Sequence, residues 1–164
     1  MTAHHVPVIL VSPQDRILIA AEYPNITPEL LFDYFVRPQL VTRWWAPHAE
    51  LHARQGGAFH FAWEDMNLHL RGQYTFVERG RKLAFTWQWD HEKSSGRLPR
   101  SVIVTFEPCR DGAMLTIQHM PYADNPTEQA ERKAHSEAWQ YFLSQLQKLT
   151  AGHAHHIAPV EAQR

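Results

Sequence analysis

The stretch LAFTWQWD, from Leu83 to Asp90, alternates large apolar side chains with smaller or polar ones. Alternation with a period of two is typical of a β-strand that has one buried face and one solvated face. On one face of the predicted strand lie Leu83, Phe85, Trp87 and Trp89. Aromatic rings gathered on one face have two interpretations, because they either fill a hydrophobic core or line a cavity that holds a ligand.

The same alternation recurs on both sides of this stretch and predicts an antiparallel meander. In-phase apolar residues occur in segments 59–63, 68–76, 83–89, 102–106 and 115–119, with turn residues between them. Short alternating runs separated by turn signals read as strands, here five. Each predicted strand is apolar on one face only, so the sheet needs a cover on one side.

The predicted cover is a long helix near the C-terminus. Asn125 is the expected N-cap and Pro126 suits the first helical position, and the helix is predicted to run to about Ala151 with Gly152 as its stop. The second half of its inward stripe is apolar and consists of Ala138, Trp139, Phe142, Leu146 and Leu149. The first half carries Glu131 and His135, and polar groups on a buried face require a partner, a water or a ligand.

The N-terminal third of the chain predicts strands followed by two short helices. The apolar residues 6–11 and 16–23 flank the turn sequence SPQD, so a hairpin or one bent strand is expected. Thr27 is a suitable cap for a first helix, which should stop near Arg37 because Pro38 disfavours helical backbone in the residue before it. A second helix is expected over residues 38–45.

The polar ends of the chain delimit one domain. Residues 1–5 and 152–164 are rich in histidine and lack periodicity, so we expect flexible tails there. Residues 6–151 then form a single domain, which is an ordinary size for one hydrophobic core.

This order of elements resembles the helix-grip fold of the START-like, or SRPBCC, superfamily. Within it, the chain is similar to the family named after the activator of the heat-shock-protein-90 ATPase. The segments that carry the resemblance are TPELLFDYFVRPQLVTRWWAP, GGAFHF, GQYTFVERGRKLAFTWQW, VTFEPCRDGAMLTIQHM and HSEAWQYFLSQLQKL, which together span about residues 16–149. The resemblance implies an α+β fold in which a curved antiparallel sheet wraps around the long C-terminal helix, with two short helices after the first strand.

The same resemblance implies less about activity. Stand-alone members of the family are known mostly as single domains without an established reaction, and members of the wider superfamily bind lipids, hormones and polyketides between sheet and helix. Co-chaperone function belongs to relatives that carry an additional N-terminal domain.

Composition excludes several classes of partner. The chain has 16 Lys and Arg against 17 Asp and Glu, and its pI is about 6.9, so no long-range field attracts nucleic acid or an anionic membrane. No apolar run approaches the roughly 20 residues of a membrane span. The single cysteine, Cys109, cannot form an internal disulfide, and the N-terminal apolar run is too short for a secretory signal. We therefore expect a cytoplasmic protein without membrane insertion.

The candidate ligand-binding residues are the in-phase aromatic side chains and two residues that should face them. They are Phe59, Phe61, Trp63, Tyr74, Phe85, Trp87, Trp89, Phe106, His119 and Trp139. Strand phase points His119 toward the helix face that carries Glu131 and His135, and these last two are neighbours because they are four residues apart. The three polar residues are candidate acid and base groups, and the alternative is that they are merely surface or supporting polar residues.

Histidines are numerous, yet their spacing favours no metal site. His48 and His52 have a spacing that would serve on a helix, but Pro47 precedes them and no cysteine or acidic partner lies at ligand spacing. The tail residues His153, His155 and His156 would bind nickel or zinc only adventitiously. We predict neither a metal nor a cofactor.

The sequence favours a small-molecule-binding domain for an apolar, aromatic or lipid-like ligand. One alternative is a cyclase-type or hydrolase-type enzyme that uses the pocket histidines and Glu131. Another is a co-chaperone-like interaction module, which the mostly polar outward strand positions disfavour. The apolar run at residues 6–11 allows a homodimer.

Overall fold

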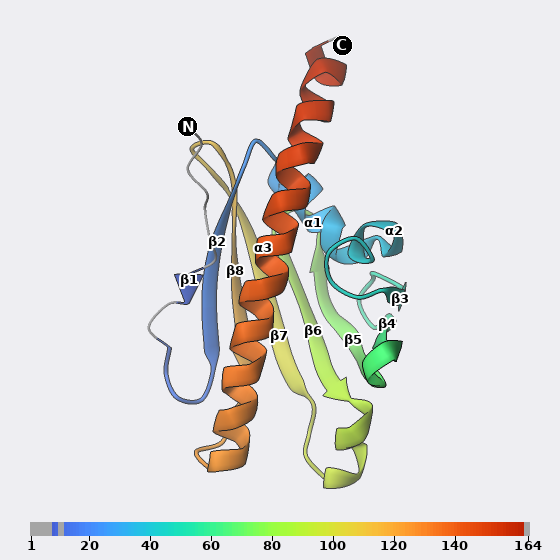
Figure 1. Ribbon diagram of the computed structural model, residues 1–164, viewed down its shortest axis with the longest axis vertical. Coiled ribbons are helices and arrows are strands. Elements are labelled where there is room, and N and C mark those ends of the chain that lie inside the picture. The colour runs from blue at the N-terminus through green and yellow to red at the C-terminus, as the bar shows by residue number, and fades with distance from the viewer. Residues whose placement is uncertain (1–7, 10–11, 163–164) are drawn as a thin grey trace.

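The computed structural model describes residues 8–9 and 12–162, with side chains described for Val8 and for residues 12–152. One antiparallel sheet and one long helix make up most of this part of the chain (Figure 1). The strands follow the spatial order β1-β2-β8-β7-β6-β5-β4-β3. Their bounds are β1 Val8–Ile9, β2 Ile17–Pro24, β3 His48–Leu51, β4 Ala58–Trp63, β5 Leu68–Glu78, β6 Lys82–Trp89, β7 Arg100–Cys109 and β8 Gly112–Met120.

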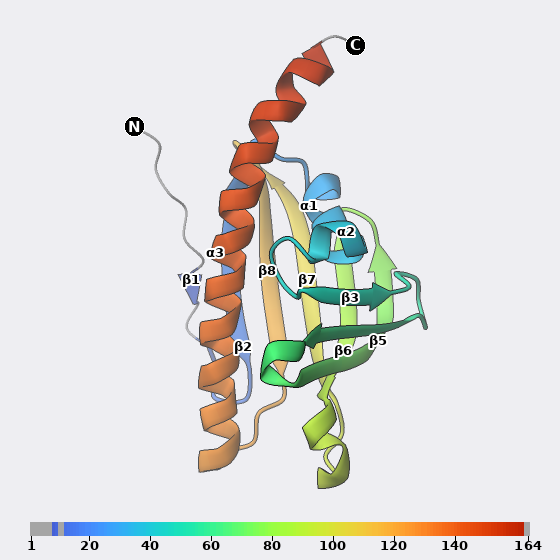
Figure 2. The ribbon, with the colours of Figure 1, turned by 45° about the vertical axis from the view of Figure 1, so that its right-hand side comes forward.

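The helices lie at one end and across one face of the sheet. They are α1 Pro28–Val36, α2 Pro38–Val41 and α3 Pro126–Ala162, with 3₁₀ turns η1 Glu64–Met66 and η2 Asp90–Ser95. Figure 2 shows β3 and β4 running crosswise to β7 and β8, so the sheet curls beside α3. This is the predicted α+β helix-grip arrangement. Within the described residues, no helix is long and apolar enough to span a membrane.

The strand predictions are largely confirmed. The five predicted strands of the meander correspond to β4 through β8, and each pairs antiparallel with the next. The N-terminal segment forms a hairpin and not one bent strand, because Val8 pairs with Ala20. Sequence reasoning missed β3, whose four residues include none that is buried and therefore show no apolar alternation.

The first short helix matches its prediction, whereas the second is shorter. The Thr27 hydroxyl oxygen accepts a hydrogen bond from the Leu30 amide at 3.1 Å, and α1 ends before Arg37. The second helix, predicted over residues 38–45, ends at Val41. The Trp44 indole N–H donates to the Tyr34 carbonyl at 2.8 Å, which fixes the chain as a turn at this point.

The long helix begins as predicted and ends later. The Asn125 side-chain oxygen accepts a hydrogen bond from the Glu128 amide at 2.8 Å. The predicted end near Ala151 is wrong, because α3 continues through Gly152 to Ala162. A glycine ends a helix where it adopts the left-handed conformation, and Gly152 does not adopt it. The predicted tail at residues 1–5 lies outside the described residues.

Aromatic rings pack closely at the end of the sheet that α1 and α2 cover. Phe106 on β7 meets Phe32 and Phe35 of α1 with ring centroids 5.4 Å and 5.5 Å apart. We call residues 126–142 of α3 its first half and residues 143–162 its second half. In the second half Leu143 and Leu146 are fully buried, whereas the inward side of the first half meets a cavity.

Candidate functional site

A cavity of about 250 Å³ lies between the first half of α3 and the inner face of the sheet. Its walls are almost entirely apolar and include five indole rings. The lining residues are Trp45, Trp63, Met66, Leu68, Trp87, Trp89, Ala134, His135, Ala138, Trp139 and Phe142. An apolar cavity with a few convergent polar groups is the usual form of a small-molecule site.

The predicted aromatic wall divides into a packed part and a lining part. Trp63, Trp87, Trp89 and Trp139 line the cavity. Phe59, Phe61, Tyr74 and Phe85 pack on one another and leave no space for a water-sized molecule between them. Phe106 packs against α1 as described above. A ligand in this cavity would therefore meet only the tryptophans of the predicted set.

His135 is the polar residue on the cavity wall. Its Nε2 accepts a hydrogen bond from the Trp89 indole N–H at 3.1 Å, and its Nδ1 lies 2.7 Å from the Tyr122 hydroxyl. Because Nε2 accepts, the neutral ring carries its proton on Nδ1 and donates it to the Tyr122 oxygen. Burial, assisted by the positive charge of Arg100, lowers the pKa of His135 to about 4. The imidazole is therefore neutral at pH 7.

His119 on β8 points toward His135 on α3, which is the direction that strand phase and helix phase predicted. The two imidazole rings are nearly parallel with centroids 5.1 Å apart. The Trp139 indole N–H donates to His119 Nδ1 at 3.1 Å, so the proton of the neutral ring sits on Nε2. Burial holds the pKa of His119 well below its usual range.

Two buried N–H groups lack an acceptor, and they belong to rings that contact His135. Among the described residues, neither Trp87 Nε1 nor His119 Nε2 has a hydrogen-bond partner. The two rings are in contact, with centroids 4.5 Å apart. An unpaired buried donor costs about 1–3 kcal/mol, so an acceptor oxygen from a ligand or a water would lower the free energy here.

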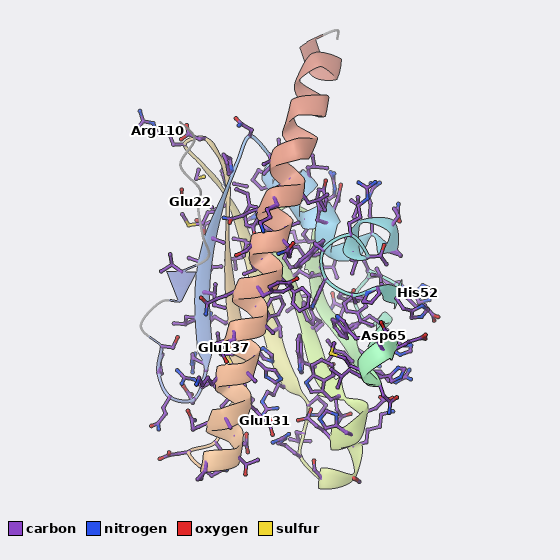
Figure 3. All side chains as sticks on the ribbon, in the orientation of Figure 1. Glu22, His52, Asp65, Arg110, Glu131 and Glu137 are labelled. Carbon is purple, nitrogen blue, oxygen red and sulfur yellow. The ribbon has the colours of Figure 1, made fainter. Side chains whose placement is uncertain are left out.

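Glu131 is held by arginines and not by His135. Arg100, which is 2% exposed, forms ion pairs with Glu128 and Glu131 at 3.0 Å each and with Glu92 at 3.3 Å. Arg97 contacts the same three carboxylates. Figure 3 shows Glu131 on the N-terminal turns of α3. We call these two arginines and three glutamates the charge cluster, and it joins β7, η2 and α3.

The arrangement is better suited to binding than to proton transfer. A histidine with a pKa near 4 is a weak base at neutral pH, and both of its ring nitrogens already have partners. The carboxylate predicted to assist it is paired with Arg100.

Sequence reasoning missed several residues of the site. Trp45 follows α2, and its approach to the cavity depends on the turn that shortens this helix. Tyr122 lies beyond the last strand, where no alternation signals its direction. Ala134 and Ala138 carried a usable signal, since two small residues one helical turn apart leave space beside a helix.

Comparison with known proteins is consistent with this fold. The sequence model of the family described as Activator of Hsp90 ATPase homolog 1-like protein matches residues 25–151. No curated protein matches the chain.

Three solved structures illustrate the likeness. A protein from Rhodobacter sphaeroides has a TM-score of 0.76 at 16% identity, with 89% of this chain and 99% of that chain covered. A protein from Mesorhizobium loti has a TM-score of 0.73 at 20% identity, covering 83% and 96%. An HSP90 activator from Plasmodium falciparum has a TM-score of 0.66 at 20% identity, covering 84% and 96%. At these identities the likeness establishes the fold alone.

Proposed function

Because the chain belongs to the Activator of Hsp90 ATPase homolog 1-like family, and because a cavity lies between its sheet and α3, we propose that it binds an apolar, ring-containing small molecule. The observation that carries this proposal is the tryptophan-lined space of about 250 Å³, and one of its lining residues, Trp87, has a buried indole N–H without a partner. Tryptophan provides a large apolar face together with one hydrogen-bond donor.

The size of the cavity limits the ligand. A dry engineered cavity of about 150 Å³ holds benzene, and ordinary ligand pockets begin at about 300 Å³. The space here fits one ring or two fused rings and is too small to enclose a long acyl chain. The unpaired N–H of Trp87 favours a ligand that carries an acceptor oxygen, such as a carbonyl.

A cavity-filling substitution tests the proposal. Native mass spectrometry and calorimetry with 2-acetylnaphthalene would compare the parent protein with Ala138→Phe, which places a ring at the cavity wall. Ala130→Phe is the matched control, because Ala130 is exposed on the same helix and does not line the cavity. We expect binding to the parent and the control and at least about tenfold weaker binding to Ala138→Phe, a difference of about 1.4 kcal/mol. Equal binding by all three proteins would refute the proposal.

A second candidate function is activation of a chaperone ATPase. The observation that favours it is the shared fold with the Plasmodium falciparum HSP90 activator. Such a function works through an exposed surface and does not need the cavity. A purified HSP90-type chaperone whose ATPase rate rises equally with the parent and with Ala138→Phe would support this function.

A further inference from the structure

A cluster of histidines lies on the outer face of the sheet, away from α3. In the registers of β3 with β4 and of β4 with β5, Glu50 is opposite His60, and Ala62 stands between His48 and His69. Residues two apart on a strand share a face, so these four polar side chains project from the same side of the sheet. Ala62 offers only a methyl group and leaves room above it for the surrounding rings.

The donor atoms of this cluster are close together. One donor atom each from His48, Glu50 and His60 lies within 4.8 Å of the others. His48 Nε2 is 3.1 Å from Glu50 Oε1, and His60 Nε2 is 2.9 Å from His69 Nδ1. Ligand atoms of a tetrahedral zinc ion, bound at about 2.0–2.2 Å, lie about 3.3 Å apart. Small side-chain movements would therefore complete such a site.

We propose that His48, Glu50 and His60 bind a divalent transition-metal ion, with Zn²⁺ as the best match. Two imidazoles and one carboxylate are the donor set of zinc sites that keep a fourth position open. His69 acts as a positioning residue, because its contact with His60 fixes the orientation of that ring. This inference goes against the prediction from sequence, which considered helical spacing only, whereas on a strand positions 48 and 50 share a face.

Glu50 and Arg71 lie opposite His60 on the two neighbouring strands. Arg71 is itself paired with Asp90 at 2.9 Å, and the Glu50 carboxylate supplies the negative charge that the ion requires.

A groove on the same face gives access to the open position. It has a volume of about 550 Å³, and Glu50, His60 and Arg71 are among its lining residues. A small anionic molecule in this groove would meet both the bound ion and the Arg71 guanidinium.

The test is a Zn²⁺ titration of the full chain by calorimetry. All proteins would carry the substitutions His153→Ala, His155→Ala and His156→Ala, so that these three histidines cannot bind the ion. His48→Gln and His60→Ala remove ligands, while His52→Ala is the matched control. His52 lines the same groove at the β3 edge but is not part of the cluster (Figure 3).

We expect one equivalent of Zn²⁺ in the parent and the control, with affinity at least tenfold lower in His48→Gln and in His60→Ala. Co²⁺ titration should give visible absorption bands that these two variants lose. The His48 side chain is 43% exposed, so its replacement leaves the fold intact and an unchanged affinity in that variant overturns the proposal. Absence of binding in the parent that lacks the tail histidines overturns it as well.

Discussion

His135 has two hydrogen-bonding partners inside the protein, and the bond from Trp89 requires its neutral form. The Trp89 indole N–H donates to His135 Nε2. A proton on Nε2 would remove the lone pair that accepts this bond. Protonation of the folded protein would therefore break this bond and place a charge in an apolar surrounding. Burial lowers the pKa of His135 to about 4 in the folded protein, against about 6.5 in an unfolded chain.

This difference in pKa predicts acid-sensitive stability. Between about pH 6.5 and pH 4 the unfolded chain binds more protons than the folded one, so the free energy of unfolding falls as pH falls. The full loss from His135 is about 3 kcal/mol, of which about 2 kcal/mol is lost by pH 5. Urea unfolding at pH 7.5 and pH 5 should show a smaller decrease for His135→Gln than for the parent.

The exposed His52 provides the control for this experiment. His52→Gln should keep the pH dependence of the parent, because His52 is exposed and does not line the cavity. A parent protein equally stable at both pH values would contradict the interpretation of His135.

The unpaired N–H of Trp87 predicts a specificity that depends on one atom. The parent should bind 2-acetylnaphthalene more tightly than 2-ethylnaphthalene, which has similar shape and no acceptor oxygen. The preference should amount to about 0.5–1.5 kcal/mol, the net contribution of a neutral hydrogen bond. Trp87→Phe should still bind both compounds but with equal affinity, because the donor is removed. Calorimetry with the two compounds measures the preference, and a preference retained by Trp87→Phe would contradict the assignment of Trp87 as the donor.

The elements differ in how well sequence alone predicts them. Strands β4 to β8 follow from alternation, and α1 follows from its Thr27 cap, because these signals are local. The short β3 has no buried residue, so nothing in its pattern distinguishes it from a loop.

The site was predictable in part, for a similar reason. Strand phase placed Trp87 and Phe85 on one face of the sheet. Trp87 lines the cavity and Phe85 is packed, and this difference depends on the distance between α3 and the sheet at each position, which strand phase does not give. The partner of Glu131 was not predictable, since Arg100 is distant in sequence and reaches it only after the sheet forms.

The charge cluster predicts that two neighbouring arginines contribute unequally to stability. Removing one partner of a buried ion pair costs about 3–5 kcal/mol, because the remaining charges stay buried without compensation. Arg100→Met should therefore lower the free energy of unfolding by about that amount. Arg97→Met should cost less, since the Arg97 side chain is 28% exposed. Urea unfolding compares the two variants, and equal losses would show that the cluster behaves as a surface network.

The cap of α1 predicts a smaller effect. Thr27→Ala removes the acceptor for the Leu30 amide and should cost about 1 kcal/mol in free energy of unfolding. Thr27→Ser keeps the hydroxyl and should retain most of the stability. If the two variants lose equal stability, the side-chain bond does not stabilise α1.

Across the whole molecule, α3 joins two regions with different packing. In its second half Leu143 and Leu146 are fully buried, and the Tyr23 hydroxyl donates to the Leu143 carbonyl at 3.0 Å. In its first half the inward side faces the cavity, where His135 and the two exposed alanines at 134 and 138 replace large apolar side chains. One half of this continuous helix is therefore held by close apolar packing, whereas the other half is held by the charge cluster and borders a cavity.

This division predicts that the two halves of α3 open separately. Amides of residues 128–138 should exchange with deuterium faster than those of residues 143–149 by about tenfold or more, the ratio for a difference of about 1.4 kcal/mol. Leu146→Ala should lower the free energy of unfolding by about 2–5 kcal/mol and speed amide exchange in the second half. Exchange rates in the first half should stay the same, because amides there exchange through local opening. Bound 2-acetylnaphthalene should slow the first half more than the second. Equal rates in both halves, and an equal response to Leu146→Ala, would mean that α3 and the sheet open as one cooperative unit.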